Sequence, residues 1–453
     1  MPGRLQFDLQ LGRPAPARTG GSRRGPMRLL VVGDFSARPA AERPPLGERP
    51  THRVDLDNLD AVIARLAPRL NLPAGELRIG GLDDFHPDSL YARLDLFEAL
   101  RQARAKPPQT GGDLLGPLLG KPAAAAAPTA APAATGLDAL IQRIVAPHIV
   151  QDTSAQAKPY LAAVDAAIAE QMRELLHEPA LQALEAAWRG VQWLIASLEL
   201  DENLQLHLFD VSRDELLADV IAAQGQLAQT GLHRALADRW RNVPGGEGWS
   251  LIAGLYRFGR SDADIGLLAA LGLIASQAGG PFIAGADPAL AGDDAAALAG
   301  WNTLRHSEAA PWIGLAAPRV LLRLPYGKGS DPISAFAFEE VVGAPVHEQF
   351  LWGNPSLAVA LLMGRAFSLN GWEMEPGDER EIGDLPAYTY LQDGEKELQA
   401  CAESYLGEQG GQALLDAGLM PVLSHRHRNA VTVMRMQSVA EPAAALAGLG
   451  VSR

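Results

Sequence analysis

The hydrophobic pattern of the chain begins with a continuous apolar run. The segment MRLLVVG at 27–33 is short and does not alternate, which predicts a β-strand buried on both faces and ending at Gly33 and Asp34. Residues 55–72 follow with apolar side chains spaced for one helix face. These side chains are Leu56, Leu59, Ile63, Leu66 and Leu70. A short strand and a second helix, which carries Leu90, Leu94 and Phe97 on one stripe, complete the N-terminal pattern.

Residues 106–136 interrupt this pattern. They consist mainly of Pro, Ala and Gly, and the repeated prolines prevent a continuous helix. We therefore expect a semi-extended linker between two regions of the chain. Residues 1–26 are rich in Gly, Pro and Arg and predict a flexible arm, in which LQFDLQL alternates as a short strand would.

Beyond the linker, helical and strand patterns alternate. The first pattern predicts a short amphipathic helix that ends before Pro147. The apolar stripe of this helix consists of Leu137, Leu140, Ile141, Ile144 and Val145. Residues 157–200 predict helix with a break at Pro179. Further strands are predicted within 204–212, 249–258, 280–286, 312–325 and 420–438, and further helices within 213–224, 262–278 and 354–371. This order predicts an α/β (α+β layered) fold, with mixed sheets and flanking helices.

Composition and charge narrow the class of protein. Of 453 residues, 47% are hydrophobic, and the formal net charge is −14, which argues against a nucleic-acid-binding surface. The N-terminus lacks the apolar core of a secretory signal. The longest apolar stretch, 265–276, is too short to cross a bilayer. We expect a cytoplasmic protein without direct membrane insertion.

The candidate chemistry is sparse. Asp34 stands at a strand end, where α/β enzymes often place a catalytic carboxylate, but no phosphate-binding loop accompanies it. A turn-capping role is the better interpretation. The calcium-loop pattern fails at Leu59, and His347 with Glu348 lacks the second histidine of a zinc motif.

Cys401, the single cysteine, excludes an internal disulfide and a thiolate-rich metal site. It could act as a nucleophile with His425 or His427, but no signature surrounds it, and its segment, 396–406, predicts a helix. A buried structural thiol is favoured.

A second group of side chains could form an aromatic and cationic ligand pocket, although core packing is favoured for it. Its members are Trp301, Arg305, Trp312, Arg323 and Tyr326. We therefore predict no catalytic, cofactor-binding or metal-binding residue, and no enzymatic activity.

Two sets of sequence blocks resemble one protein family. RLLVVGDFSARP, GERPTHRVDLDNLDAVIARLAPRL and GLDDFHPDSL resemble, in order and spacing, the small subunit of the type VI secretion contractile sheath. LLHEPALQALEAAWRGVQWLI, PFIAGADPAL, HEQFLWGNPSLAVALLMGRAFSLNGW and DAGLMPVLSHRHRNAVTVMRMQS are among the blocks that resemble its large subunit. We call 27–105 the small-subunit-like region and 137–453 the large-subunit-like region.

The resemblance implies a structural protein whose two halves pack together and assemble into a helical sheath. Such a sheath surrounds an inner tube and contracts to drive protein secretion. The implied partners are the protein itself or separate sheath subunits, the inner-tube protein and baseplate components, with no cofactor and no nucleic acid. A Clp-type AAA+ unfoldase recognises an N-terminal helix of the large subunit in this family, and residues 137–145 match its position.

The chain departs from the family in one respect. Large subunits continue past the block that matches VTVMRMQS into a C-terminal region that knits neighbouring subunits together, whereas this sequence stops at Arg453. An alternative is therefore a sheath-like accessory or adaptor protein of the same apparatus that does not polymerise.

Overall fold

The computed structural model describes residues 25–105 and 157–449, except positions 293, 295 and 393. The linker at 106–136 and the amphipathic stripe at 137–145 lie outside the described residues, as does the arm up to residue 24. The described chain forms two compact units. The first unit contains residues up to 68, 183–324 and those from 350 onwards, and the second contains 69–182 and 325–349. Each unit therefore contains residues of both the small-subunit-like and the large-subunit-like regions.

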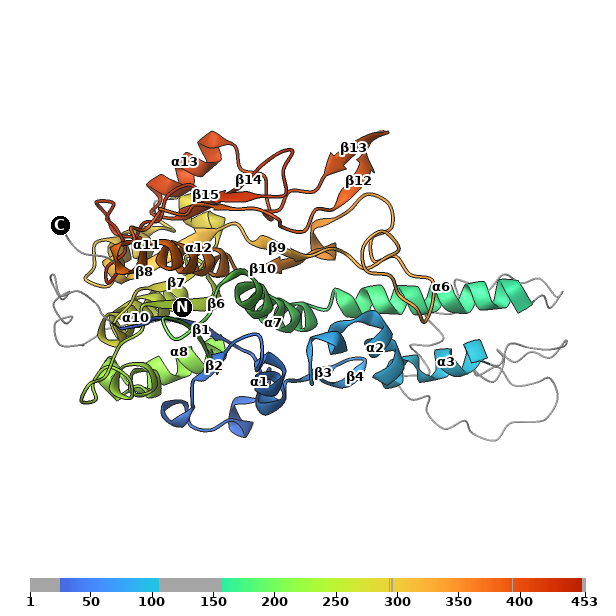
Figure 1. Ribbon diagram of the computed structural model, residues 1–453, viewed down its shortest axis with the longest axis horizontal. Coiled ribbons are helices and arrows are strands. Elements are labelled where there is room, and N and C mark those ends of the chain that lie inside the picture. The colour runs from blue at the N-terminus through green and yellow to red at the C-terminus, as the bar shows by residue number, and fades with distance from the viewer. Residues whose placement is uncertain (1–24, 106–156, 293, 295, 393, 450–453) are drawn as a thin grey trace. The chain divides into compact units, whose positions relative to one another are not determined.

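The first unit is built on a nine-stranded sheet in the order β11-β15-β14-β8-β7-β6-β1-β5-β2. Figure 1 shows this order running down the page from β14 to β2. The six strands from β14 to β5 are parallel, whereas β2 and β15 pair antiparallel to their neighbours. The strands are β1 (Met27–Gly33), β2 (His52–Val54), β5 (Leu204–Asp210), β6 (Leu251–Phe258), β7 (Phe282–Ala286), β8 (Ile313–Ala317), β11 (Glu381–Ile382), β14 (Met420–Ser424) and β15 (Val431–Val433).

Strand β1 is an interior strand of this sheet, third from its β2 edge. It pairs along its whole length with β5, from Met27 opposite Leu204 to Gly33 opposite Asp210. On its other side Leu29 lies opposite Leu251 of β6. Side chains from Leu29 to Val32 are buried on both faces, and each contributes about 2 kcal/mol of hydrophobic stabilisation. The small-subunit-like region thus provides an interior strand, β1, and the edge strand β2 to a sheet made otherwise by the large-subunit-like region.

Helices cover both faces of the sheet. Helix α10 (Asp262–Ala278) packs on β6 and β7 with α8 (Arg213–Ala222) and α11 (Ala299–Arg305) beside it. Helix α12 (Pro355–Asn370) crosses β1, β5, β6, β7 and β8. Almost every side chain of α12 is buried, as expected for a helix between a sheet and a second helix layer. The remaining elements of this unit include α1 (Leu59–Leu66), α9 (Gly231–His233), α13 (Glu408–Asp416), the antiparallel pair β9 (Val320–Arg323) with β10 (Leu351–Gly353), and the hairpin of β12 (Thr389–Gln392) with β13 (Glu395–Leu398).

The second unit is mainly helical. It contains the hairpin of β3 (Arg69–Leu72) with β4 (Gly75–Arg78), α2 (Pro87–Arg93), α3 (Glu98–Ala105) and α6 (Ala157–Leu176). Helix α3 packs on α6, where Arg104 Nε lies 2.7 Å from Asp165 Oδ1. Helix α7 (Pro179–Ser197) begins in this unit and continues into the first.

The predicted mixed α/β class is confirmed, as are the break at Pro179 and the elements predicted after it up to 286. Three local predictions are wrong. The second helix, predicted to carry Leu90, Leu94 and Phe97, is divided, because Leu94 has an extended backbone (ψ 135°) between α2 and the 3₁₀ turn Asp95–Phe97. The helix predicted over 55–72 ends at Leu66, because Ala67 adopts a left-handed conformation (φ 46°) before Pro68, and Leu70 then belongs to strand β3. The helix predicted around Cys401 is instead β13 followed by an irregular segment that bonds to β9.

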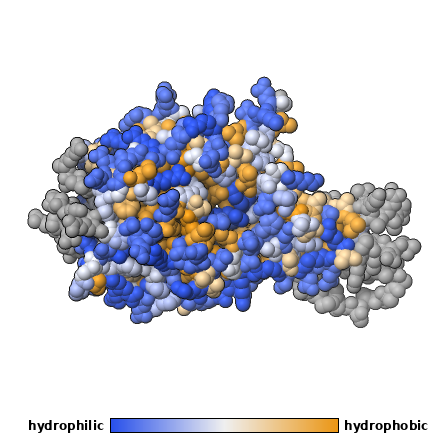
Figure 2. All heavy atoms as spheres, in the orientation of Figure 1, coloured by the Kyte–Doolittle hydropathy of each residue, from blue (hydrophilic) through white to orange (hydrophobic). Residues whose placement is uncertain are grey.

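The surface shows where apolar residues stay exposed. On the face in Figure 2, hydrophilic residues predominate, and hydrophobic residues gather in patches between them. The large side chains with most exposure, Leu56, Leu369 and Leu391, come from separate segments. Isolated exposed leucines of this kind are ordinary on soluble domains.

His207 on β5 is a buried ionisable group next to β1. Its ring lies 5.2 Å from Trp249 and 5.6 Å from Trp240, and only 5% of the residue is exposed. Burial, with smaller contributions from Arg28 and Arg53, lowers the pKa of His207 to about 4. The folded protein therefore holds this imidazole neutral at pH 7.

This pKa predicts a loss of stability in mild acid. An unfolded chain binds a proton at His207 below pH 6.5, whereas the folded chain resists it down to about pH 4. Between pH 7.5 and pH 5 the free energy of unfolding should fall by about 2 kcal/mol from this group alone. Urea unfolding across this range should show the decrease, and His207→Leu should flatten it. The exposed His427→Leu control should keep the wild-type slope, and an unchanged slope in His207→Leu would contradict the assignment.

The position of β1 predicts that the large-subunit-like region does not fold alone. A chain starting at residue 137 leaves β5 and β6 without their shared hydrogen-bonding partner and uncovers the core between the sheet and α12. It should be insoluble on expression, and coexpression of residues 1–136 as a separate polypeptide should restore a soluble, copurifying pair. Soluble, monomeric 137–453 with a cooperative unfolding transition would contradict this prediction.

Candidate functional site at the carboxyl end of the central strand

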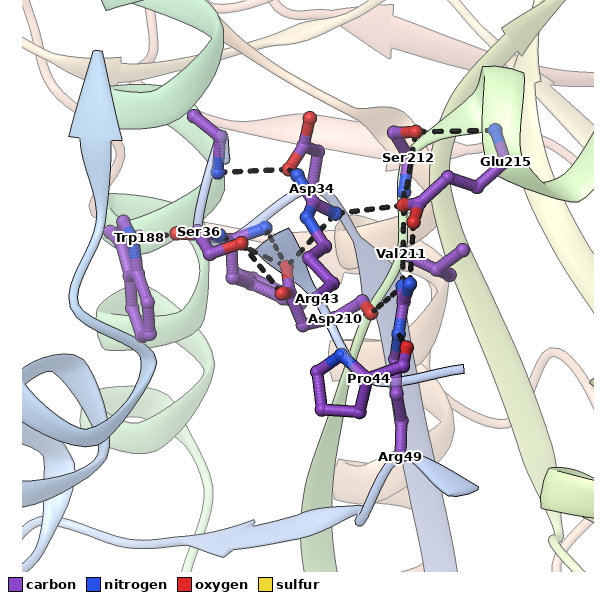
Figure 3. Close-up of polar contacts among 12 residues, drawn as sticks. Asp34, Ser36, Arg43, Pro44, Arg49, Trp188, Asp210, Val211, Ser212 and Glu215 are labelled. Atoms are coloured by element: carbon purple, nitrogen blue, oxygen red, sulfur yellow. Dashed lines mark hydrogen bonds and ion pairs between the residues drawn. The ribbon is translucent and has the colours of Figure 1, made fainter. Parts of the chain in front are cut away.

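The carboxyl end of β1 is the place where this sheet topology would admit a ligand. The chain leaves β1 toward the β2 edge and leaves β6 toward β7, so the connections diverge between these two neighbours. Open α/β sheets bind ligands in the crevice formed at such a point. Figure 3 shows that polar side chains of the protein itself occupy this position. We call the group formed by Asp34, Ser36, Arg43, Arg49, Asp210 and Glu215 the seam.

Gly33 and Asp34 end the strand. A side chain on Gly33 would bring its Cβ to 3.0 Å from Leu255 Cδ1 on β6, which is tighter than ordinary van der Waals contact, so glycine suits the close approach of the two strands here. Asp34 Oδ1 accepts a hydrogen bond from the Ala37 amide at 2.9 Å and thereby closes the turn that follows β1. The carboxylate predicted to mark a strand end therefore lies in a local turn-capping geometry.

Arg43 is the centre of the seam. Its side chain is 2% exposed, and its Nη2 lies 2.5 Å from Asp34 Oδ1. Its Nη1 lies 2.9 Å from Glu215 Oε2 and 3.7 Å from Asp210 Oδ1. One buried guanidinium thus neutralises carboxylates from both regions of the chain.

Arg49 forms a second link of the same kind. Its Nη2 lies 2.5 Å from Glu215 Oε1, and its Nη1 donates to the Asp210 carbonyl at 3.0 Å. Glu215 is held in place by a capping box at the start of α8, in which Ser212 and Glu215 bond each other's backbone amides. The fork geometry of arginine suits this two-point contact.

Asp210 and Trp188 fix the backbone that leaves β1. Asp210 Oδ1 accepts from the amides of Phe35 at 2.8 Å and Ser36 at 3.0 Å, and its Oδ2 accepts from the Ser36 hydroxyl at 2.7 Å. The indole of Trp188, on α7, donates to the Phe35 carbonyl at 3.0 Å. In each of these contacts one partner belongs to the small-subunit-like region and the other to the large-subunit-like region.

The charges of the seam shift the pKa values of its carboxyl groups. Burial raises the pKa of Asp34, against the opposing effect of Arg43. Burial would also raise the pKa of Glu215, but hydrogen bonds from Arg49 and Ser212 and the charge of Arg43 hold it below the ordinary value. Two arginines face three carboxylates, so the seam is almost neutral overall. Such an arrangement fastens two segments of the chain together.

The second unit holds another set of contacts between the two regions. Asp88, on α2, accepts from the Ser334 hydroxyl at 2.7 Å and from the amides of Ser334 and Ala335 at 3.0 and 2.9 Å. The rings of Tyr91 and Phe336 lie 5.0 Å apart. Burial opposes ionisation of Asp88, but the bonds from Ser334 and Ala335 leave its pKa lowered. We call this group of contacts, within residues 86–91 and 325–349, the second seam.

The side chains of Cys401 and His425, considered from sequence as a nucleophile and its base, have other partners in the structure. Cys401 is buried, its pKa is raised to about 11 by burial, and its Sγ lies 3.7 Å from the Pro386 carbonyl. His425 bonds Thr432 at 2.8 Å. At neutral pH this thiol has little of the thiolate that a nucleophile requires.

The five residues considered as a ligand pocket are bound to different partners. Trp301 Nε1 donates to the Ala417 carbonyl, and Arg305 Nη1 pairs with Glu441 at 2.9 Å. Arg323 pairs with Glu185, and Trp312 and Tyr326 are buried. Across the described ranges, no three residues of the types that bind metals form a cluster that could hold an ion.

Of the residues that make the seam, the sequence pattern singled out only Asp34. Arg43 and Arg49 lie in a proline-rich segment that reads as a loop, and Asp210 reads as the polar end of a strand. For the other residues of the seam, the capping-box spacing of Ser212 and Glu215 was the one feature of the sequence that indicated a fixed side chain. The unfoldase-recognition candidates Leu137, Leu140, Ile141, Ile144 and Val145 lie outside the described residues.

None of the described helices is both long enough and apolar enough to span a bilayer.

Comparisons with known proteins match the two regions separately. The VipB family model, described as EvpB/VC_A0108, tail sheath N-terminal domain, matches residues 158–440. The model described as type VI secretion system, VipA, VC_A0107 or Hcp2 matches residues 22–126. The type VI secretion system sheath protein TssC1 of Pseudomonas aeruginosa is 30% identical over 331 residues, which cover 66% of each chain, just under two thirds of that relative. Arg43 and Arg49 fall in the VipA match, and Asp210 and Glu215 fall in the VipB match.

The seam predicts unequal effects of two substitutions. Arg43→Met leaves buried carboxylates of both regions without their shared cation and should lower the free energy of unfolding by about 3–5 kcal/mol. Asp34→Asn should cost less than about 1 kcal/mol, because 41% of the Asp34 side chain is exposed and solvent screens its charge. Urea unfolding of both variants at pH 7.5 measures the difference, and equal losses would contradict the central role of Arg43.

Proposed function

This chain belongs to the VipB family of type VI secretion tail sheath proteins, and we propose that it is a fused sheath subunit that assembles around an inner tube and contracts to drive protein secretion. The observation that carries the proposal is the insertion of β1, within the VipA match, between β5 and β6, within the VipB match. The two matched regions share one sheet and one core, which is the arrangement of two interlocked subunits.

Covalent fusion suits such a pair. Residues 106–136 join the two regions, and a linker of this length gives the joined parts an effective concentration of about 1 mM. It also fixes their ratio at one to one. Each assembling subunit then already contains β1 and the two arginines of the seam, Arg43 and Arg49.

The proposed contraction is a repacking of subunits between two arrangements. Interfaces between packed protein surfaces are bistable, so subunits held in an extended lattice can move together to a lower-energy one. The buried seam supports this role, because a subunit that changes its neighbours must keep its own core intact. We expect the interior of the first unit to be the same in both arrangements.

The partners follow from this role. We propose that the protein binds further copies of itself or separate sheath subunits, the inner-tube protein and the baseplate, and that it works in the cytoplasm. A Clp-type unfoldase that recycles contracted sheath would recognise the stripe that begins at Leu137. We propose no catalytic function, and the occupation of the sheet crevice by Arg43 and Arg49 supports this.

Negative-stain electron microscopy of the purified full chain tests the proposal. Alone or with the inner-tube protein, the chain should form tubular assemblies with a regular helical repeat. Arg43→Met provides the matched variant, which should lose these assemblies together with its stability.

Monomers under both conditions would contradict the polymerising function and favour the non-polymerising accessory role. A pull-down then distinguishes the two, since an accessory protein should recover separately encoded sheath subunits of the same apparatus.

A further inference from the structure

Asn370 and Gly371, at the end of helix α12, form the one asparagine–glycine pair in the chain. Both residues have open surroundings. The Asn370 side chain is exposed, and a Cβ added to Gly371 would meet no heavy atom within 4 Å. Because glycine itself has no side chain, nothing shields the Gly371 nitrogen from the amide group of Asn370.

An asparagine can react with the backbone nitrogen that follows it. The Gly371 nitrogen attacks Cγ of Asn370, the new N–Cγ bond closes a cyclic imide, and the Cγ–Nδ2 bond breaks. The Nδ2 group leaves as ammonia with the proton of the Gly371 amide. Water then adds to either ring carbonyl and opens the ring to aspartate or isoaspartate. Because both reacting groups belong to one chain, the reaction requires only water.

Two contacts hold this pair in an unreactive arrangement. The Gly371 amide donates to the Phe367 carbonyl as the cap of α12, so its nitrogen is engaged with the helix. Asn370 Nδ2 donates to Asp378 Oδ2 at 3.0 Å, and the same oxygen accepts from the Glu375 amide at 2.9 Å. Attack on Cγ requires both contacts of the pair to open, so the reaction rate depends on local opening of this segment.

We propose that Asn370 is a site of spontaneous deamidation, and that Asp378 controls its rate by holding the side-chain amide away from the Gly371 nitrogen. Deamidation replaces the amide that donates to Asp378 with a second carboxylate. Two carboxylates at hydrogen-bonding distance repel each other, so the turn at 375–378 loses its contact with α12. The inference concerns a single chain and does not depend on assembly.

Trp372 connects this site to the start of β1. Its ring centroid lies 5.0 Å from that of Phe367, and its Nε1 donates to the Gly25 carbonyl at 2.6 Å. Gly25 lies two residues before Met27, the first residue of β1. Isoaspartate at position 370 would also lengthen the backbone between α12 and Trp372. We therefore expect the modification to weaken the contact that holds the chain where it enters β1.

Peptide mass spectrometry of the full chain, incubated in mildly alkaline buffer, tests the control by Asp378. In Asp378→Ala, Asn370 should deamidate at least about fivefold faster than in the wild type, because the variant removes a hydrogen bond to a charged acceptor. Glu375→Ala is the matched control. It removes a carboxylate from the same turn but keeps the backbone amide that bonds Asp378, so the wild-type rate is expected.

Asn370→Asp, which imitates one reaction product, tests the connection to β1. The indole N–H signal of Trp372 in a nuclear magnetic resonance spectrum is identified by its loss in Trp372→Phe. In Asn370→Asp this signal should shift, and its proton should exchange with solvent faster than in the wild type. Asn302→Asp adds the same charge at another exposed asparagine and should leave the signal unchanged.

The control by Asp378 is refuted by an equal or slower reaction in Asp378→Ala, or by an equal acceleration in Glu375→Ala. An Asn370 that stays intact in every variant refutes the site itself. A wild-type Trp372 signal in Asn370→Asp refutes the connection to β1. If Asp378→Ala does not fold, Asp378→Asn replaces it, because it removes the charge and keeps the shape. A smaller increase in rate is then expected, and the wild-type rate would refute the control.

Discussion

The pairing of β1 with β5 and β6 is the interaction on which the rest of the structure depends. It joins strands that lie more than 170 residues apart in the chain, and it places apolar side chains from Leu29 to Val32 under the helices on both faces. Backbone groups in the middle of a buried sheet have no water to bond, so the strand cannot be removed without leaving its two neighbours unsatisfied. The division of the chain into two sequence families is therefore not a division into two folding units.

The seam extends this constraint from the backbone to side chains. Parallel strands deliver their carboxyl ends to one edge, and here that edge receives Asp210, which lies in register with Gly33, and Asp34, the residue after Gly33. Two carboxylates at such an edge repel each other unless a cation is supplied, and Arg43 supplies it from the segment that follows β1, while Arg49 from the same segment pairs with Glu215. At the sheet edge where this topology commonly places an active site, the charged side chains of the two regions pair with one another.

The regular elements could be predicted from the sequence because their periods are local. The apolar run of β1, the helix of α10 and the break at Pro179 each follow from neighbouring residues. The end of α1 at Leu66 depends on a backbone conformation at Ala67 that the apolar pattern does not encode. The seam was beyond reach for a different reason: Arg43 and Glu215 are brought together only by the long-range register of β1 on β5, and a buried arginine looks like a solvated one in a proline-rich loop.

The charge pattern of the seam also has an evolutionary consequence. A small-subunit-like region with neutral residues at 43 and 49 would bury Asp210 and Glu215 without a counter-ion. A large-subunit-like region without those carboxylates would leave two buried guanidinium groups without an anionic partner. In a cell that encodes more than one sheath, such mismatches would disfavour hybrids between paralogous halves. Fusion and charge matching would then act as two independent barriers to crosstalk, and the two regions would be expected to diverge only together.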